Sequence, residues 1–254
     1  METGGADGVG SKWIHRILAS SPSVHRALAV EYRLSALRTG PTCSVRNPFP
    51  AALLDALSAY LHLLSLGFTP SNIILTGESV GGNMALALAH LLPTINLPMP
   101  GRVIVLSPAV DPGLTWFGPG SSVQLNQSAD YGQVFFTSQV MIDAIRGAAL
   151  SREDAWNTMW ISPGGRNVPP SQRAGWFAAL RQTQTMIFVG GAEVGLDGVR
   201  TVRQRILEDL GKEEKERLVY VEEEDAPHNY ASLAGVWDPE GANAIKRAVQ
   251  FIED

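Results

Sequence analysis

The 254-residue sequence predicts an α/β fold, in which a mostly parallel sheet carries helices on both faces. Short apolar runs rich in β-branched residues alternate along the chain with longer runs of helical periodicity. Hydrophobic residues make up 45% of the chain and charged residues 18%, which excludes a disordered protein. A chain of this length and composition can bury a large core.

The first part of the chain predicts two strands and two helices. Residues 27–32 (ALAVEY) are apolar enough for a buried strand. A helix over residues 53–64 follows a Pro-Phe-Pro turn, because its apolar residues recur at three- and four-residue spacing. Residues 72–76 (NIILT) predict a second buried strand. Residues 79–92 predict a helix that is apolar on most sides and is therefore covered on more than one face.

The middle of the chain interrupts this alternation. Residues 102–106 (RVIVL) predict a third strand. The stretch that follows, from about residue 112 to 180, holds many aromatic residues among polar residues and turns. We expect it to be a mostly helical insertion over the sheet, similar to a cap or lid. It would interrupt a single domain that spans residues 1–254.

The last part of the chain returns to the alternation. Residues 185–189 (TMIFV) and 218–221 (LVYV) predict the fourth and fifth strands. Residues 199–210 predict an amphipathic helix that Gly211 ends, and residues 242–252 predict the final helix.

The composition also excludes several classes of protein. The net charge of −5 provides no basic field to hold nucleic acid. The single cysteine, Cys43, excludes an intramolecular disulfide and a cysteine-based zinc site. No apolar run approaches the roughly 20 residues of a membrane span, and residues 1–10 lack the pattern of a secretory signal. We therefore expect no membrane span and a cytoplasmic location.

One motif carries chemistry. Gly77-Glu78-Ser79-Val80-Gly81 fits G-x-S-x-G and lies between a predicted strand and a predicted helix, which is the setting that this motif requires. The tight turn exposes the Ser79 hydroxyl as a nucleophile. We expect it to need residues without side chains at Gly77 and Gly81. The Val80 amide would lie at the helix N-terminus, where it can stabilise an oxyanion.

A nucleophilic serine needs a base and an acid that orients the base. His228 lies in the loop after the last predicted strand, at the same sheet edge as the Ser79 turn. The loop after the preceding strand offers Glu193 and Asp197 as acids. A first-turn helix charge is an alternative role for either acid and suits Asp197 well. The other histidines are expected to be ordinary helix or surface residues: His15, His25, His62 and His90.

The chain resembles the hormone-sensitive-lipase-like branch of the α/β-hydrolase fold from about residue 27 to its end. Residues 30–35 (VEYRLS) look like the family's "xYRL(A/S)" strand end, and residues 47–56 (NPFPAALLDA) look like its "hPFPAAleDa" helix start. Residues 77–83 (GESVGGN) look like its "GDSAGGN" turn, and the tail supplies a glycine-rich acid loop and a Pro-His pair.

The resemblance implies Ser79 as the nucleophile and His228 as the base. In the family's "DPLxD" acid loop the first aspartate is the catalytic one. Glu193 aligns with that position and is the preferred acid, while Asp197 aligns with the second aspartate and is the alternative.

One family motif is absent from the sequence. No HGG occurs, although the family carries "HGGG" before its "YRL" strand as a source of oxyanion donors. Gly4 and Gly5 lie roughly where that motif belongs and are the nearest candidates. The strands that precede the motif in the family also lack a counterpart. We expect a truncated sequence, a shortened natural form, or a fold that has lost hydrolysis.

These features predict a serine carboxylic-ester hydrolase that works through an acyl-enzyme and needs no metal or organic cofactor. Its partner would be a small-molecule ester, with a short to medium acyl group and a hydrophobic alcohol. One alternative is a catalytically impaired binding protein. Another is an acyl-transfer or biosynthetic enzyme that reuses the same three residues. No feature of the sequence specifies an oligomeric state.

Overall fold

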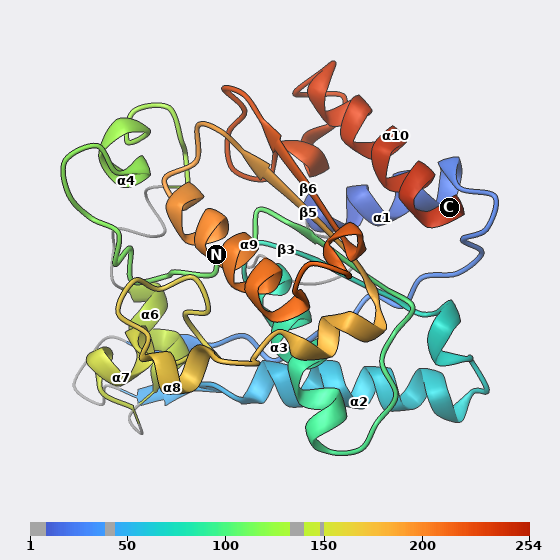
Figure 1. The fold of residues 1–254 in the computed structure, drawn as a ribbon, viewed down its shortest axis with the longest axis horizontal. Helices are drawn as coiled ribbons and strands as arrows, with labels where there is room; N and C mark the ends of the chain where they lie inside the picture. The colour runs from blue at the N-terminus through green and yellow to red at the C-terminus, as the bar shows by residue number, and fades with distance from the viewer. Residues whose placement is uncertain (1–8, 39–43, 133–139, 148–149) are drawn as a thin grey trace.

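The protein is built around a parallel β-sheet (Figure 1). A computed structural model describes residues 9–38, 44–132, 140–147 and 150–254. Within these ranges the main sheet has the strand order β3-β4-β5-β6, and each neighbouring pair is parallel. The strands are β3 (Ile74–Glu78), β4 (Arg102–Leu106), β5 (Gln184–Gly190) and β6 (Leu218–Glu223). These strands confirm the last four strands that the sequence predicts.

Helices of very different lengths surround this sheet. The α-helices are α1 (Val9–Ser20), α2 (Ala51–Ser65), α3 (Val80–Thr94), α4 (Ser122–Leu125), α6 (Val140–Arg146), α7 (Arg152–Trp156), α8 (Pro170–Arg173), α9 (Leu196–Leu210) and α10 (Glu240–Glu253). The 3₁₀-helices are η1 (Pro70–Asn72), η2 (Ala178–Gln182), η3 (Lys215–Arg217) and η4 (Tyr230–Leu233). A separate antiparallel pair consists of β1 (Ala36–Arg38) and β2 (Ser44–Arg46).

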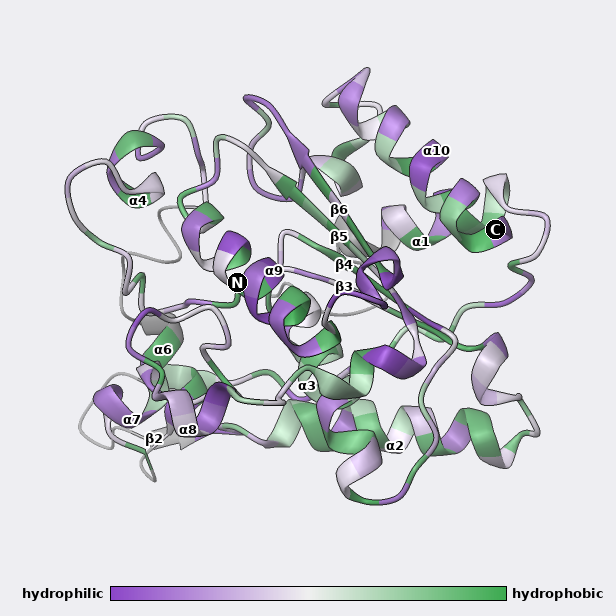
Figure 2. Cartoon of the chain, viewed as in Figure 1, coloured by the Kyte–Doolittle hydropathy of each residue, from purple (hydrophilic) through white to green (hydrophobic). Residues whose placement is uncertain are grey.

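The two faces of the sheet bury two hydrophobic clusters. Because side chains alternate along a strand, Val103 and Val105 of β4 pack with α3 and α9, while Ile104 and Leu106 pack with α1 and α10. Figure 1 shows the strands between these two groups of helices, and Figure 2 shows hydrophobic stretches along the strands. Hydrophobic and hydrophilic residues mix along α10 (Figure 2), as in a helix with one face on the core. The predicted fold class, a parallel sheet with helices on both faces, is confirmed.

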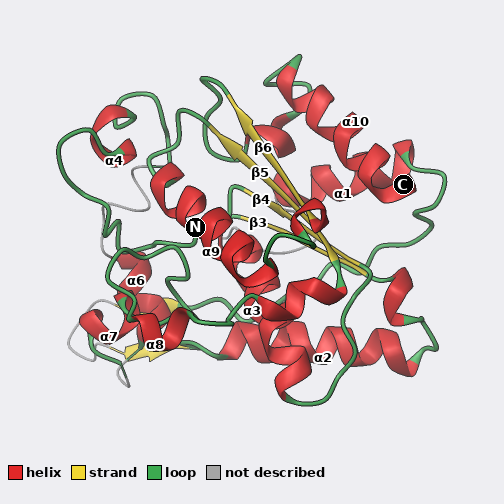
Figure 3. Ribbon diagram, viewed as in Figure 1, coloured by secondary structure: helices red, strands yellow, loops and turns green. Residues whose placement is uncertain are grey.

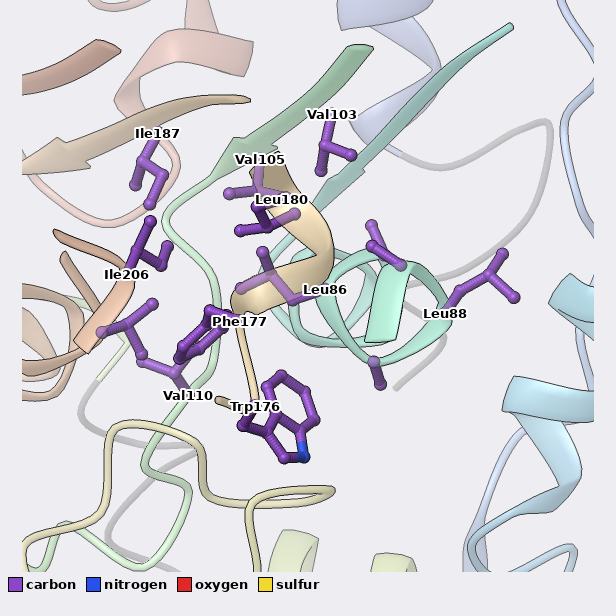
Figure 4. Close-up of a cluster of buried hydrophobic side chains, with 14 of the residues drawn as sticks. Leu86, Leu88, Val103, Val105, Val110, Trp176, Phe177, Leu180, Ile187 and Ile206 are labelled. Carbon is purple, nitrogen blue, oxygen red and sulfur yellow. The ribbon is translucent and has the colours of Figure 1, made fainter. Parts of the chain in front are cut away.

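The larger cluster lies between the sheet, α3, α9 and the η2 region. Figure 4 shows Leu86 of α3, Val105 of β4 and Ile187 of β5 meeting Phe177 and Leu180 in this layer. All five side chains are almost completely buried. This packing fixes α3 against the sheet, and the end of α3 nearest the carboxyl ends of the strands carries the candidate nucleophile.

Residues 27–32 do not form the strand that the sequence predicts. They have no regular secondary structure, and Leu28 is 46% exposed. β3 is therefore the edge strand of the described sheet. A cavity of about 360 Å³ lies beside this edge, lined by Trp13 of α1, Leu28, Tyr32 and β3 residues that include Glu78. The apolar run thus lines this cavity together with β3 and does not pair with the strand.

The segment between β4 and β5 contains short helices joined by long loops (Figure 3). Its described helices are four to seven residues long, so this segment is less helical than the sequence suggests. Its role as a cap or lid remains a prediction. Over the described ranges, none of the helices combines the length and apolar character needed to cross a membrane.

Candidate active site

Ser79 lies in a sharp turn between β3 and α3. Its backbone has φ 51° and ψ −118°, a positive-φ conformation that residues other than glycine rarely adopt. Two hydrogen bonds fix the turn to the last residue of β4 and to the loop after it. The Ser79 amide donates to the Leu106 carbonyl at 2.9 Å, and the Ala109 amide donates to the Ser79 carbonyl at 2.8 Å. The serine is thus held at the carboxyl end of the sheet in a conformation that its own sequence does not favour.

The glycines around this turn differ in what they allow. A Cβ atom at Gly77 would lie 2.3 Å from the Gly81 carbonyl oxygen, so Gly77 must lack a side chain. The same reasoning is wrong for Gly81, where a Cβ atom would have no neighbour within 4 Å because Gly81 lines the cavity beside β3. The second crowded position is Gly82, whose Cβ atom would lie 2.9 Å from the Pro108 side chain.

Three of the predicted site residues form a continuous hydrogen-bonded row. The Ser79 hydroxyl oxygen lies 3.0 Å from Nε2 of His228, and Nδ1 of His228 lies 2.9 Å from Oε2 of Glu193. His228 is 5% exposed and Glu193 is 2% exposed. The residues come from the turns after β3, β5 and β6, which meet at one edge of the sheet because these strands are parallel.

The second oxygen of the Glu193 carboxylate is also held. Oε1 accepts a hydrogen bond from the Ser107 hydroxyl at 2.5 Å and another from the Gly190 amide at 2.6 Å. Ser107 in turn accepts a hydrogen bond from the Asn229 amide at 2.9 Å. Ser107 was not among the predicted site residues, although it directly follows β4 at the same sheet edge. These bonds leave Oε2 of Glu193 facing the imidazole.

Asp197 lies elsewhere. It is in the first turn of α9, where its carboxylate accepts a hydrogen bond from the Ser122 amide at 2.7 Å. Of the two candidate acids, Glu193 is therefore the one that contacts His228. Asp197 has the alternative role that the sequence suggests, that of a charge near a helix N-terminus.

Buried charges act on His228 from several sides. Burial by itself lowers the pKa of His228, but the hydrogen bond and charge of Glu193, together with the charges of Asp130 and Glu78, outweigh burial and raise it. Burial also raises the pKa of Glu78, against a hydrogen bond from Ser232 and the nearby His228. The site is thus an acidic and largely buried environment around one imidazole.

The aromatic residues between β4 and β5 take different positions. Trp176 and Phe177 belong to the core, and Trp176 stacks on His90 with ring centroids 4.3 Å apart. The histidine also lies 2.7 Å from the Trp176 carbonyl through Nδ1, so His90 has the structural role that we expected. Tyr131 lies next to the candidate site, where its hydroxyl donates to the His228 carbonyl at 2.7 Å.

The candidate oxyanion donors are only partly within the described ranges. Val80 is the first residue of α3, where backbone amides have no intrahelical acceptor. The Val80 amide is therefore at the positive end of the helix dipole, directly after Ser79 in the chain. Gly4 and Gly5 lie outside the described residues.

Comparisons with known proteins identify the family and the fold. The sequence model of a family described as "alpha/beta hydrolase fold" matches residues 10–232. An esterase of Acinetobacter venetianus is 26% identical over 98% of this chain and 72% of its own length. The structure of an esterase/lipase from an uncultured bacterium aligns with 95% of this chain at a TM-score of 0.69, with 24% identity over 69% of its length.

A second solved structure carries the more specific name. An esterase from the bacterial hormone-sensitive lipase family is 25% identical, with a TM-score of 0.62 over 87% of this chain. The chain spans 63% of that esterase. These matches confirm the resemblance to hormone-sensitive-lipase-like esterases. The chain belongs to the α/β-hydrolase fold family.

Proposed function

We propose that the chain is a serine carboxylic-ester hydrolase with Ser79, His228 and Glu193 as its catalytic triad. The observation that carries this proposal is the unbroken row of hydrogen bonds from the Ser79 hydroxyl through the imidazole to the Glu193 carboxylate. Its distances of 3.0 and 2.9 Å are within reach for proton transfer and orientation. The esterase and lipase names of the relatives support the same reaction class.

Acylation begins at Ser79. Because Glu193 accepts a hydrogen bond from Nδ1 of His228, Nε2 is left as the acceptor for the serine proton. The oxygen attacks the ester carbonyl as His228 takes the proton. The imidazolium then returns that proton to the departing alcohol, and an acyl-Ser79 ester remains.

Deacylation reverses these roles. Neutral His228 takes a proton from a water molecule, which attacks the acyl group. The tetrahedral intermediate collapses, and Ser79 regains its proton from the imidazolium. The carboxylic acid leaves, and the starting hydrogen bonds form again. The Glu193 charge favours the imidazolium in both steps, because the pair is buried and poorly screened.

The ester carbonyl oxygen becomes an oxyanion during each step, and it needs hydrogen-bond donors next to it. The Val80 amide supplies one, because it opens α3 directly after the nucleophile. Gly4 and Gly5 remain the candidates for the others. Each donor of this kind lowers the activation barrier by about 2.7–4 kcal/mol. A site with fewer donors would therefore hydrolyse esters more slowly but would still hydrolyse them.

The proposed substrates are short to medium acyl esters of hydrophobic alcohols. The experiment measures hydrolysis of p-nitrophenyl acetate, butyrate and octanoate by the full chain and by Ser79→Ala. Ser58→Ala is a matched control, because Ser58 is a helix residue whose hydroxyl only bonds to the Leu54 carbonyl within α2. We expect Ser58→Ala to equal the wild type and Ser79→Ala to lose activity at least 1000-fold, as expected when a nucleophile is removed.

Labelling with a fluorophosphonate separates hydrolysis from simple binding. The reagent should phosphonylate Ser79 with loss of fluoride, and peptide mass spectrometry should locate the label on that residue. Equal ester turnover by the wild type and Ser79→Ala, or a folded wild type that takes no label, would contradict the proposal. Faster product formation with an added alcohol acceptor than with water would point to acyl transfer instead.

A further inference from the structure

One stretch between β4 and β5 contacts both loops of the proposed triad. We call residues 122–131 the bridging segment. Near its start, the Ser122 amide donates to the Asp197 carboxylate at 2.7 Å and the Ser122 hydroxyl donates to the Val194 carbonyl at 2.9 Å. The Asn126 side chain donates to the Glu193 carbonyl at 2.8 Å. This end of the bridging segment therefore holds the backbone of the Glu193 loop.

Asp130, at the other end of the bridging segment, contacts both loops with one side chain. Asp130 as a whole residue is 2% exposed. Oδ2 accepts a hydrogen bond from the Val194 amide at 2.8 Å, and Oδ1 accepts one from the Gly132 amide at 2.9 Å and a longer one from the His228 amide at 3.4 Å. The next residue, Tyr131, donates its hydroxyl proton to the His228 carbonyl at 2.7 Å.

These contacts have a common geometric result. Val194 adjoins Glu193, so the two oxygens of Asp130 hold the backbones of the proposed acid and base. A buried carboxylate bound by backbone amides is a strong and directional connection. We propose that Asp130, assisted by Tyr131, is a positioning residue that sets the separation between Glu193 and His228. This inference rests on the proposed function, because it assigns Asp130 to the same triad.

The charge of Asp130 provides a signature that a purely structural residue lacks. Among the described residues, the titratable groups that face His228 include Glu193 from the loop after β5, Glu78 from the end of β3, and Asp130 and Tyr131 from the bridging segment. The negative charge of Asp130 raises the pKa of His228. Removing this charge must lower that pKa, whether or not the protein loses stability.

The experiment compares Asp130→Asn with a matched variant in the full chain. Asparagine keeps the shape but places an NH₂ group against a backbone amide. We expect kcat to fall about 10- to 100-fold with little change in KM, the loss typical of a buried hydrogen bond to a charged group. The acidic limb of kcat/KM should move to lower pH. Asp111→Asn is the control, because Asp111 is also a buried carboxylate after β4 but accepts hydrogen bonds from Thr115 in its own turn.

Two further measurements keep the inference testable. Active-site titration with the fluorophosphonate corrects kcat for any inactive fraction. The NMR titration of the His228 ring in a Ser79→Ala background needs no turnover, so it tests Asp130 even if the chain hydrolyses no ester. Tyr131→Phe serves if Asp130→Asn does not fold, since Tyr131 is half-exposed and loses only its hydroxyl. We expect it to lower kcat about 3- to 10-fold, which corresponds to one neutral hydrogen bond.

The outcomes are distinct. A lower His228 pKa and a lower kcat in Asp130→Asn, with neither change in Asp111→Asn, support the inference. An unchanged acidic limb and an unchanged His228 titration in Asp130→Asn would overturn it. So would a Tyr131→Phe variant that has wild-type kcat when Asp130→Asn cannot be folded. A wild type without esterase activity but with the expected His228 shift would contradict the proposed function and leave the positioning role supported.

Discussion

Replacing Glu193 with glutamine tests the triad at its acid, and the structure fixes how the new side chain must sit. The Gly190 amide and the Ser107 hydroxyl both donate to Oε1 of Glu193, at 2.6 and 2.5 Å. The glutamine oxygen has to take this position because the Gly190 amide needs an acceptor. Its NH₂ group then faces Nδ1 of His228, where Oε2 now lies at 2.9 Å.

The magnitude follows from the tautomer that this arrangement imposes. An NH₂ donor beside Nδ1 forces the imidazole proton onto Nε2, which faces the Ser79 hydroxyl at 3.0 Å. That tautomer cannot accept the serine proton. We expect kcat to fall about 10⁴-fold, the effect of a wrong tautomer in this kind of triad, which is about 5 kcal/mol at 1.36 kcal/mol for each tenfold change.

The assay is p-nitrophenyl butyrate hydrolysis at saturating substrate, with circular dichroism to verify folding. Asp197→Asn is the matched control, because Asp197 is the rival acid and bonds to Ser122 away from the imidazole. It should keep kcat within about tenfold of the wild type, as expected for a change outside the reacting groups. A folded Glu193→Gln variant within tenfold of the wild type, or a larger loss in Asp197→Asn, would refute the reasoning.

Three further changes test other parts of the structure. Glu78→Gln removes a negative charge that raises the pKa of His228. Because catalysis needs neutral imidazole, the acidic limb of kcat/KM should move to lower pH, and a move to higher pH would contradict the charge assignment. Gly77→Ala should lower the free energy of unfolding in urea by about 2–4 kcal/mol, because its Cβ atom would meet the Gly81 carbonyl. Gly81→Ala should change that free energy by less than about 1 kcal/mol, and equal losses in the two variants would contradict the crowding at Gly77. Phe188→Ala should cost about 3–5 kcal/mol because the ring is fully buried, and differential scanning calorimetry of Phe188→Leu, with a much smaller loss, provides the comparison.

The parts of the fold that sequence predicts well are those with their own local signal. The runs that became β3, β4, β5 and β6 are short, apolar and bounded by turn residues, as buried parallel strands are. Once these strands are parallel, their carboxyl ends share one edge. The turns that carry Ser79, Glu193 and His228 therefore had to lie close together, and the structure brings these residues within hydrogen-bonding distance of one another.

The strand predicted over residues 27–32 does not form, which shows that an apolar run alone is not enough to predict a strand. That run is as apolar as several real strands, but a strand also needs a partner for its backbone groups. In the structure the run lies along the cavity beside β3 and leaves Leu28 exposed. The helix α1, which buries Trp13 and Ile17, was not predicted, because we assigned no element before residue 27.

The residues that support the site could not all be predicted from the sequence, for a different reason. Asp130 lies 64 residues before Val194 and 98 before His228, so its contacts depend on how the whole segment after β4 folds back. No local pattern marks it as different from a surface aspartate. Ser107 could have been found, because it follows β4 at the edge where the other site residues also follow their strands.

The backbone at Ser79 has a consequence for directed evolution of this protein. A positive-φ conformation costs a residue with a side chain about 1–3 kcal/mol, and glycine avoids most of that cost. A library screened only for heat resistance is therefore expected to favour Ser79→Gly, a variant that avoids this backbone cost and lacks the proposed nucleophile. Any thermostabilised descendant of this chain should be selected for stability and ester turnover together, because at this one position the two requirements favour different residues.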